Sequence, residues 1–115
     1  MIEDLKVLCV KAILWTVISV FLIMSSVVYH ELAHVVSCKN AGGEASISYF
    51  SDIQHLGITK CALSNVSSSE LTVKKLSDNI NETIGYHVLS LEYFLILAGF
   101  LFYSKEELRN IILKF

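Results

Sequence analysis

Residues 12–34 read AILWTVISVFLIMSSVVYHELAH, a long apolar run that ends in a polar motif with two histidines. Its first eighteen residues, 12–29, carry no charge. A helix rises about 1.5 Å per residue, so a run of this length is close to what crosses a hydrocarbon core of about 30 Å. The apolar residues 7–10 extend the run, interrupted only by Lys11. The sequence therefore predicts a membrane-spanning helix over residues 7–38.

A signal peptide is the rival interpretation of the same stretch, because Lys6 and Lys11 precede an apolar block. Signal peptides have apolar regions of about 7–15 residues, and this block is longer. It also runs directly into a polar motif rather than a cleavage site. These two features favour the spanning helix.

The polar motif at the end of the run is His30-Glu31-Leu32-Ala33-His34. Residues four apart lie on one face of a helix, so the two imidazoles can bind one metal ion. Glu31 is rotated by about 100° and can reach a metal-bound water without being a ligand. This pattern is typical of hydrolytic zinc sites, where the metal lowers the pKa of water towards about 7 and a carboxylate takes the proton. A polar cluster without metal is the alternative.

Composition agrees with a membrane protein. The 115 residues allow one domain at most, and 54% of them are hydrophobic, with a mean hydropathy of +0.60. The net charge of −2 argues against nucleic acid as a partner. A second apolar run over residues 84–103 predicts another span, which places both ends of the sequence on one side. Basic residues leave the orientation open, because five flank the side that holds both ends of the sequence (Lys6, Lys11, Lys105, Arg109, Lys114) and four lie in the segment between the spans (Lys39, Lys60, Lys74, Lys75).

The segment between the spans begins with Gly42 and Gly43, which predict a helix stop. Alternation of polar and apolar residues then predicts a β-hairpin over residues 44–63 with a loop at 51–57, and an irregular loop is the alternative. The three cysteines form no CxxC pair and no even-numbered set, so they predict neither a disulfide framework nor a thiolate site. By this reasoning Cys38 is a small apolar packing residue.

Two capping boxes predict the remaining helices. Ser67 with Glu70 introduces an amphipathic helix over residues 69–79, which ends at a polar break near 77–81. The second span then covers residues 80–103. Ser104 with Glu107 introduces an interfacial helix over residues 104–115. The expected fold class is a mainly α membrane protein with two transmembrane helices, an intervening hairpin and a C-terminal amphipathic helix.

The stretch HELAHVVSCKNAGG at residues 30–43, at the end of an apolar helix and before a short strand, resembles the site-2 protease family of intramembrane zinc metalloproteases. The resemblance covers roughly residues 12–63. It implies that His30 and His34 bind zinc, that Glu31 is the catalytic base and that transmembrane segments are cut. The third ligand of that family is an aspartate in an Asn-Pro-Asp-Gly or Leu-Asp-Gly setting. This sequence has neither setting, no proline and only two spans instead of three, so the third ligand cannot be carried over.

Helix depth offers another route to the third ligand. The motif lies about six residues, or about 9 Å, inside the end of its helix. In an antiparallel helix that starts near Asn79, the same depth corresponds to residues 85–87. His87 is therefore the leading third ligand. Glu82 is the alternative, although with Asn79 it also fits a helix cap.

These observations together predict a multi-pass membrane zinc metallopeptidase that hydrolyses peptide bonds of membrane or membrane-proximal substrates. Its partners would be the lipid bilayer and a peptide or transmembrane protein substrate. Two helices rarely enclose a cavity, so a homo-oligomer or a larger membrane complex is expected. The alternative is a non-catalytic member of the same family that acts as a structural or regulatory membrane subunit.

Overall fold

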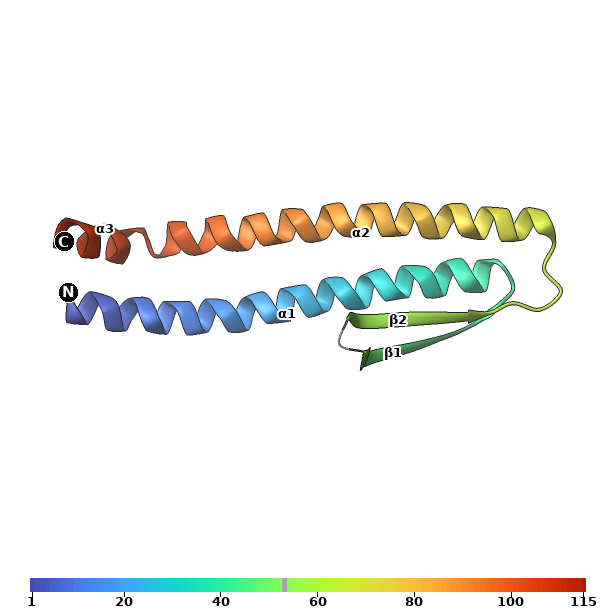
Figure 1. The fold of residues 1–115 in the computed structure, drawn as a ribbon, viewed down its shortest axis with the longest axis horizontal. Coiled ribbons are helices and arrows are strands. Elements are labelled where there is room, and N and C mark those ends of the chain that lie inside the picture. The colour runs from blue at the N-terminus through green and yellow to red at the C-terminus, as the bar shows by residue number, and fades with distance from the viewer. Residues whose placement is uncertain (53) are drawn as a thin grey trace. The chain divides into compact units, whose positions relative to one another are not determined.

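The computed structural model describes residues 1–52 and 54–115 and is mostly helical. In chain order its elements are α1 (Ile2–Asn40), β1 (Glu44–Asp52), β2 (His55–Ala62), α2 (Ser68–Tyr103) and α3 (Lys105–Leu113), as labelled in Figure 1. The chain packs as two compact units. The terminal unit comprises residues 1–23 and 89–115, and the central unit comprises residues 24–88.

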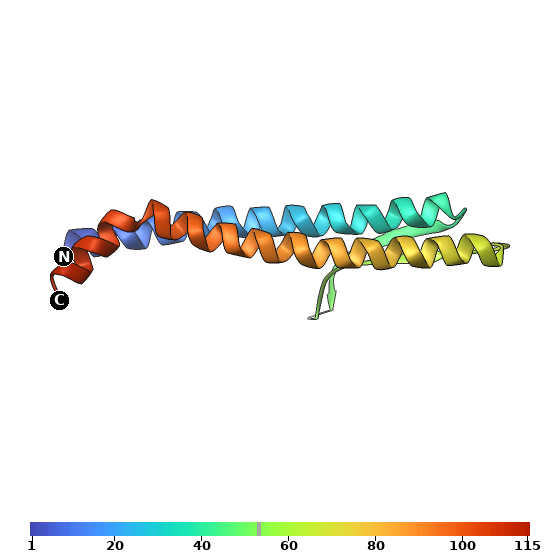
Figure 2. The same cartoon turned by 90° about the horizontal axis from the view of Figure 1, so that it is seen from above.

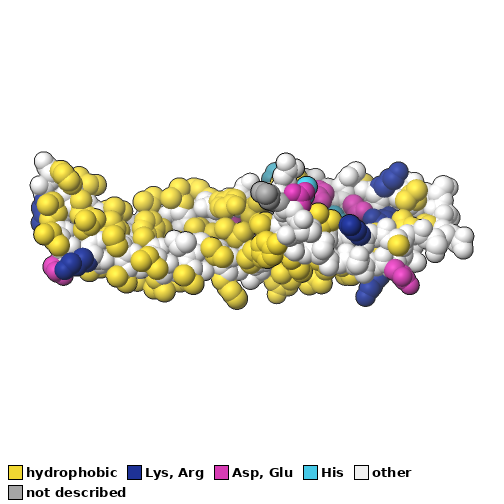
Figure 3. All heavy atoms as spheres, turned by 60° about the horizontal axis from the view of Figure 1, so that its bottom comes forward, with side chains coloured by type: hydrophobic (Ala, Val, Ile, Leu, Met, Phe, Trp, Pro, Cys, Tyr) yellow, Lys and Arg dark blue, Asp and Glu magenta, His cyan; other side chains and the backbone are white. Residues whose placement is uncertain are grey.

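Helices α1 and α2 are both long and apolar enough to cross a membrane. Their most apolar 18-residue windows have mean hydropathies of 2.5 and 1.6, and no part of either window is buried. In Figure 3, hydrophobic side chains dominate the visible face of the terminal unit, whereas charged and histidine side chains gather on that of the central unit. Large apolar side chains are therefore exposed along both helices.

The predicted break near residues 77–81 is absent, and the segments predicted as 69–79 and 80–103 form the single helix α2. The polar residues of this segment have partners that are compatible with a helix. Lys74 forms an ion pair with Asp78 one turn later, and Thr83 Oγ1 donates to the carbonyl of Asn79 at 2.9 Å. Such contacts between residues four apart support a helix where isolated Asp and Asn favour its end.

The capping box predicted at the start of α2 is confirmed. The backbone N–H of Ser67 donates to Glu70 Oε2 at 2.9 Å, and the backbone N–H of Glu70 donates to Ser67 Oγ at 3.3 Å. The capping box predicted at Ser104 is wrong. Ser104 precedes α3 but is fully buried and makes no side-chain capping bond, because Glu107 pairs with Lys11 at 2.8 Å instead.

The terminal unit joins the start of α1 to the end of α2 and to α3. Figure 2 shows α1 and α2 side by side in this unit. Trp15 Nε1 donates to the carbonyl of Ile96 at 2.9 Å, and its ring stacks on Tyr103 with 6.0 Å between centroids. Lys114 reaches Asp4 at 2.8 Å and fixes α3 near the first turn of α1. Two helices and a short third one thus pack through a few specific contacts.

The central unit begins with a sharp end to α1. Gly42 has φ +76°, its N–H donates to the carbonyl of Lys39 at 3.0 Å, and the N–H of Gly43 donates to that of Cys38 at 3.0 Å. This is a Schellman motif, for which glycine is favoured because the left-handed conformation strains residues with a Cβ. The predicted helix stop is confirmed, and the chain turns directly into β1.

The predicted hairpin is also confirmed. Strands β1 and β2 are antiparallel, with Ala45 opposite Cys61 and Tyr49 opposite Gly57, and the register shifts between Tyr49 and Asp52. Strand β2 begins at His55, inside the segment predicted as a loop. Figure 1 shows β2 beside α1, and the contacts of Thr59 with α1 agree.

A disulfide joins Cys38 at the end of α1 to Cys61 on β2, with 5.7 Å between their Cα atoms. The sequence-based prediction that the cysteines form no disulfide is therefore wrong. The cause is tertiary, because the Schellman turn and the antiparallel register bring together two residues that are 23 apart in sequence. Cys38 is fully buried, and Cys9 is a free, exposed thiol.

Candidate metal centre

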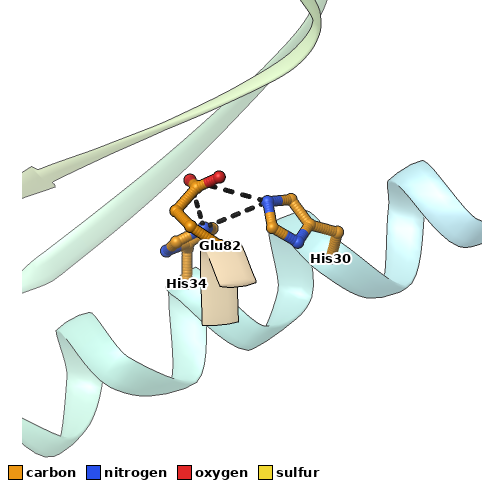
Figure 4. Close-up of side chains that lie close together, drawn as sticks. All are labelled: His30, His34 and Glu82. Atoms are coloured by element: carbon orange, nitrogen blue, oxygen red, sulfur yellow. Dashed lines mark hydrogen bonds and ion pairs between the residues drawn. The ribbon is translucent and has the colours of Figure 1, made fainter. Parts of the chain in front are cut away.

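Three potential ligands converge in the central unit. His30 and His34 come from successive turns of α1, and Glu82 comes from α2, with their tips directed towards one another (Figure 4). The two Nε2 atoms lie 3.3 Å apart. Glu82 Oε1 lies 3.6 Å from His30 Nε2 and 3.1 Å from His34 Nε2. Among residues 1–52 and 54–115 this is the one group of three or more such side chains close enough to share an ion.

The three atoms fit the ligand triangle of a tetrahedral zinc site. Zinc bonds to histidine and carboxylate are about 2.0–2.2 Å long, which separates the ligand atoms of a tetrahedral site by about 3.3–3.6 Å. The observed separations of 3.1, 3.3 and 3.6 Å are close to this range. His30, His34 and Glu82 would therefore suit a zinc ion, and zinc sites with three protein ligands can bind water as a fourth ligand.

Asp78 fixes the orientation of His34. Its Oδ1 lies 3.1 Å from His34 Nδ1, the ring nitrogen that faces away from the cluster. An ionised carboxylate holds the proton on Nδ1 and leaves the lone pair of Nε2 for a metal. This carboxylate–histidine arrangement is what metal-binding histidines ordinarily have.

Gly85 makes room for the other imidazole. It lies one turn after Glu82 on α2, and a Cβ built on it would stand 2.6 Å from His30 Nδ1. Any residue other than glycine would therefore displace this ring. The two helices approach closely at this point because glycine has no side chain, and the approach brings Glu82 within reach of both histidines.

Glu31, the predicted base, is not part of the ligand group. It is only 6% exposed, and Thr59 on β2 donates its hydroxyl to Glu31 Oε2 at 2.5 Å. A Cβ on Gly57 would lie 2.8 Å from Glu31 Cγ, so this glycine lets β2 cover the side chain closely. The hairpin therefore holds the carboxylate, and the disulfide anchors the hairpin to the same helix.

Of the two candidates for a third ligand, Glu82 lies beside His30 and His34, whereas His87 is exposed and outside this group. The reason is helix phase. At about 100° per residue, His87 is rotated by roughly 140° from Glu82 and 160° from Gly85, so it points away from α1. The spacing of Asp78, Glu82 and Gly85 at four and three residues was the available signal for one helical face. Cys38 is committed to the disulfide and offers no thiolate.

The cluster is accessible from one side. The side chain of Glu82 is 50% exposed, whereas His30 and His34 are 25% and 14% exposed. Water can therefore reach the cluster past Glu82. Comparisons with protein-family models, with curated proteins and with solved structures found no match, so conclusions about function depend on this geometry.

Proposed function

We propose that this protein is a membrane-embedded zinc metallopeptidase. One observation carries the proposal: the two histidines of the HExxH motif and Glu82 present three ligand atoms at separations of 3.1–3.6 Å. Two histidines and a glutamate are a ligand set of catalytic zinc peptidases, which keep the fourth position open. The resemblance to the site-2 protease family gives His30, His34 and Glu31 the same roles, and Glu82 replaces the aspartate of that family.

The membrane part of the proposal has its own support. The apolar windows of α1 and α2 are long enough to cross a bilayer and are unburied in this chain. In water such helices would expose many large aliphatic and aromatic side chains, which soluble monomers avoid. We therefore assign both helices as membrane spans of a multi-pass protein. The bilayer would cover these side chains.

The residues would share the chemistry in distinct roles. His30, His34 and Glu82 hold the ion, and Asp78 keeps His34 in the required tautomer. A bound zinc ion supplies Lewis acidity, which acidifies water and polarises a peptide carbonyl. Glu31 accepts a proton from the attacking water and returns it to the leaving amine. To do so its carboxylate must turn away from Thr59.

The substrate must present an extended segment, because helical carbonyls are occupied by hydrogen bonds. Strand β1 pairs only with β2 among the described residues, so its outer edge is open to a peptide strand. Residues 45–50 of this strand would be the part that pairs with the peptide. A membrane-proximal peptide could pair there and enter the site locally unwound.

A non-catalytic membrane subunit is the second candidate, and one observation favours it. Glu31 is buried and accepts a short hydrogen bond from Thr59, which suits a structural carboxylate as well as a resting base. In that case the metal would support the fold, and the purified wild-type protein would hydrolyse no peptide. The two candidates therefore differ in one measurable property, namely whether the wild type shows a hydrolytic activity that Glu31→Gln abolishes.

The first experiment is zinc content per chain of the detergent-purified protein, determined by elemental analysis. We expect about one zinc in the wild type, none in His34→Ala or Glu82→Ala, and wild-type content in His87→Ala, which serves as the matched control. Cleavage of a synthetic transmembrane peptide in the same micelles is measured next. Loss of cleavage in Glu31→Gln with zinc retained supports the peptidase, and absence of zinc from the wild type even after its addition would refute it.

A further inference from the structure

The Cys38–Cys61 disulfide carries information on membrane orientation that the basic residues do not. Disulfides form and persist in oxidising compartments, whereas cytosolic thiols are kept reduced. Both cysteines belong to the central unit, with Cys38 at the end of α1 and Cys61 on β2. The compartment that oxidises them therefore also receives the hairpin.

We propose that the hairpin and the metal cluster lie on the oxidising, extracytoplasmic side of the membrane, and that residues 1–11 and 104–115 lie on the cytoplasmic side. This rests on the proposed membrane spans. Five basic residues on the side that holds both ends of the sequence against four between the spans give no decisive preference. The disulfide decides the orientation.

The third cysteine agrees with this orientation. Cys9 is a free, exposed thiol on the first turns of α1. It precedes Cys38 by 29 residues of one helix, which is more than the roughly 20 needed to cross a bilayer core. Cys9 and the disulfide would thus lie at opposite faces of the membrane.

The contacts around the disulfide connect this orientation to the candidate site. Cys61 lies two residues after Thr59 on β2, and Thr59 donates its hydroxyl to Glu31. The disulfide therefore anchors the part of β2 that holds this carboxylate. The fully buried side chain of Cys38 lies one turn after His34. The site therefore opens to the extracytoplasmic side, and the substrates that fit it are segments of membrane proteins exposed at that surface.

The first test counts thiols in cells. The full-length protein is expressed in a bacterium with a disulfide-forming periplasm, and free thiols are trapped with an alkylating agent that adds mass before lysis. We expect one alkylated cysteine before reduction and three after reduction, with Cys9→Ser removing the first. Three alkylated cysteines before reduction would overturn the proposal.

The second test measures sidedness in a Cys9→Ser background that keeps the disulfide. A membrane-impermeant maleimide is applied to intact spheroplasts carrying Lys75→Cys or, as the matched control, Glu106→Cys, both at exposed positions. We expect labelling of Lys75→Cys in intact spheroplasts and of Glu106→Cys only after detergent is added. The reverse pattern, or equal labelling of both, refutes the orientation. Release of the protein by alkaline carbonate would instead refute the membrane spans themselves.

Discussion

Replacing Gly85 with alanine should disable the metal cluster without changing a ligand. The new Cβ would stand 2.6 Å from His30 Nδ1 and 2.8 Å from its Cε1, whereas ordinary contacts begin near 3.4 Å. The imidazole must therefore retreat by about 0.8 Å, and metal–ligand distances in functional sites tolerate only about 0.2 Å. We expect His30 to be lost as a ligand in Gly85→Ala.

The expected loss of zinc affinity follows from the binding free energy that one ligand contributes. Four-ligand zinc sites bind with apparent free energies of about 10–16 kcal/mol at pH 7, so one ligand contributes about 2.5–4 kcal/mol. The zinc dissociation constant of Gly85→Ala should then rise by roughly 70- to 900-fold. Helix propensity acts in the opposite direction, because alanine is about 1 kcal/mol better than glycine inside a helix. Weaker zinc binding in an intact helix is thus the expected combination.

The assay is competition for zinc against a chromogenic chelator in detergent, with helix content from circular dichroism. Gly99→Ala is the matched control, because its Cβ would stand 2.8 Å from the ring of Trp15 in the terminal unit. It disturbs helix packing away from the ligands and should keep wild-type zinc affinity. If Gly85→Ala binds zinc as tightly as the wild type, His30 does not lie against Gly85 and the three-ligand geometry is wrong.

Three further predictions follow from the contacts. Asp78→Asn should weaken zinc binding by about 10- to 100-fold, measured by the same competition, because His34 loses its orienting carboxylate. Cys61→Ser should lower the free energy of unfolding in denaturant by about 3 kcal/mol, because the broken loop spans 23 residues; an unchanged midpoint would contradict it. The hydrogen bond from Lys114 holds the pKa of Asp4 well below its usual 3.8, so the docking of α3 is stable above this pH and weakens as the pH falls below it. Amide exchange in α3 should accelerate there, and Lys114→Ala should reduce the pH dependence, because the N-terminal ammonium group and Asn110 still contact Asp4.

The long helices could be predicted from the sequence because their signal is local. An uncharged apolar run, a glycine pair and the Ser67–Glu70 cap each determine backbone structure within a few residues. The break near residues 77–81 was predicted from the same local preferences and is absent. In this segment Asp78 forms ion pairs with Lys74 on the same helix and with His34 on α1, and these contacts stabilise the helix. The contact with His34 arises only when α1 packs against α2, so local sequence preferences could not predict it.

The third ligand and the disulfide depend on tertiary structure. Depth along the helix gives the rise per residue but not the rotation, so it selected residues 85–87 and favoured His87 over Glu82. The face of α2 that meets α1 is decided by Gly85, whose missing side chain is a packing signal. An odd number of cysteines concealed the pairing, since the proximity of Cys38 to Cys61 arises only after the hairpin folds back on α1.

The covalent link between Cys38 and Cys61 makes a closed ring of the chain between them. Phe50, at the exposed end of the hairpin, lies inside this ring and is a natural place for a foreign protease to cut. A single cut there would open the ring without separating the fragments, because the half with both histidines would stay bonded to the half with Glu82. The protein could therefore be nicked at this end of the hairpin and still keep its candidate ligands on one molecule.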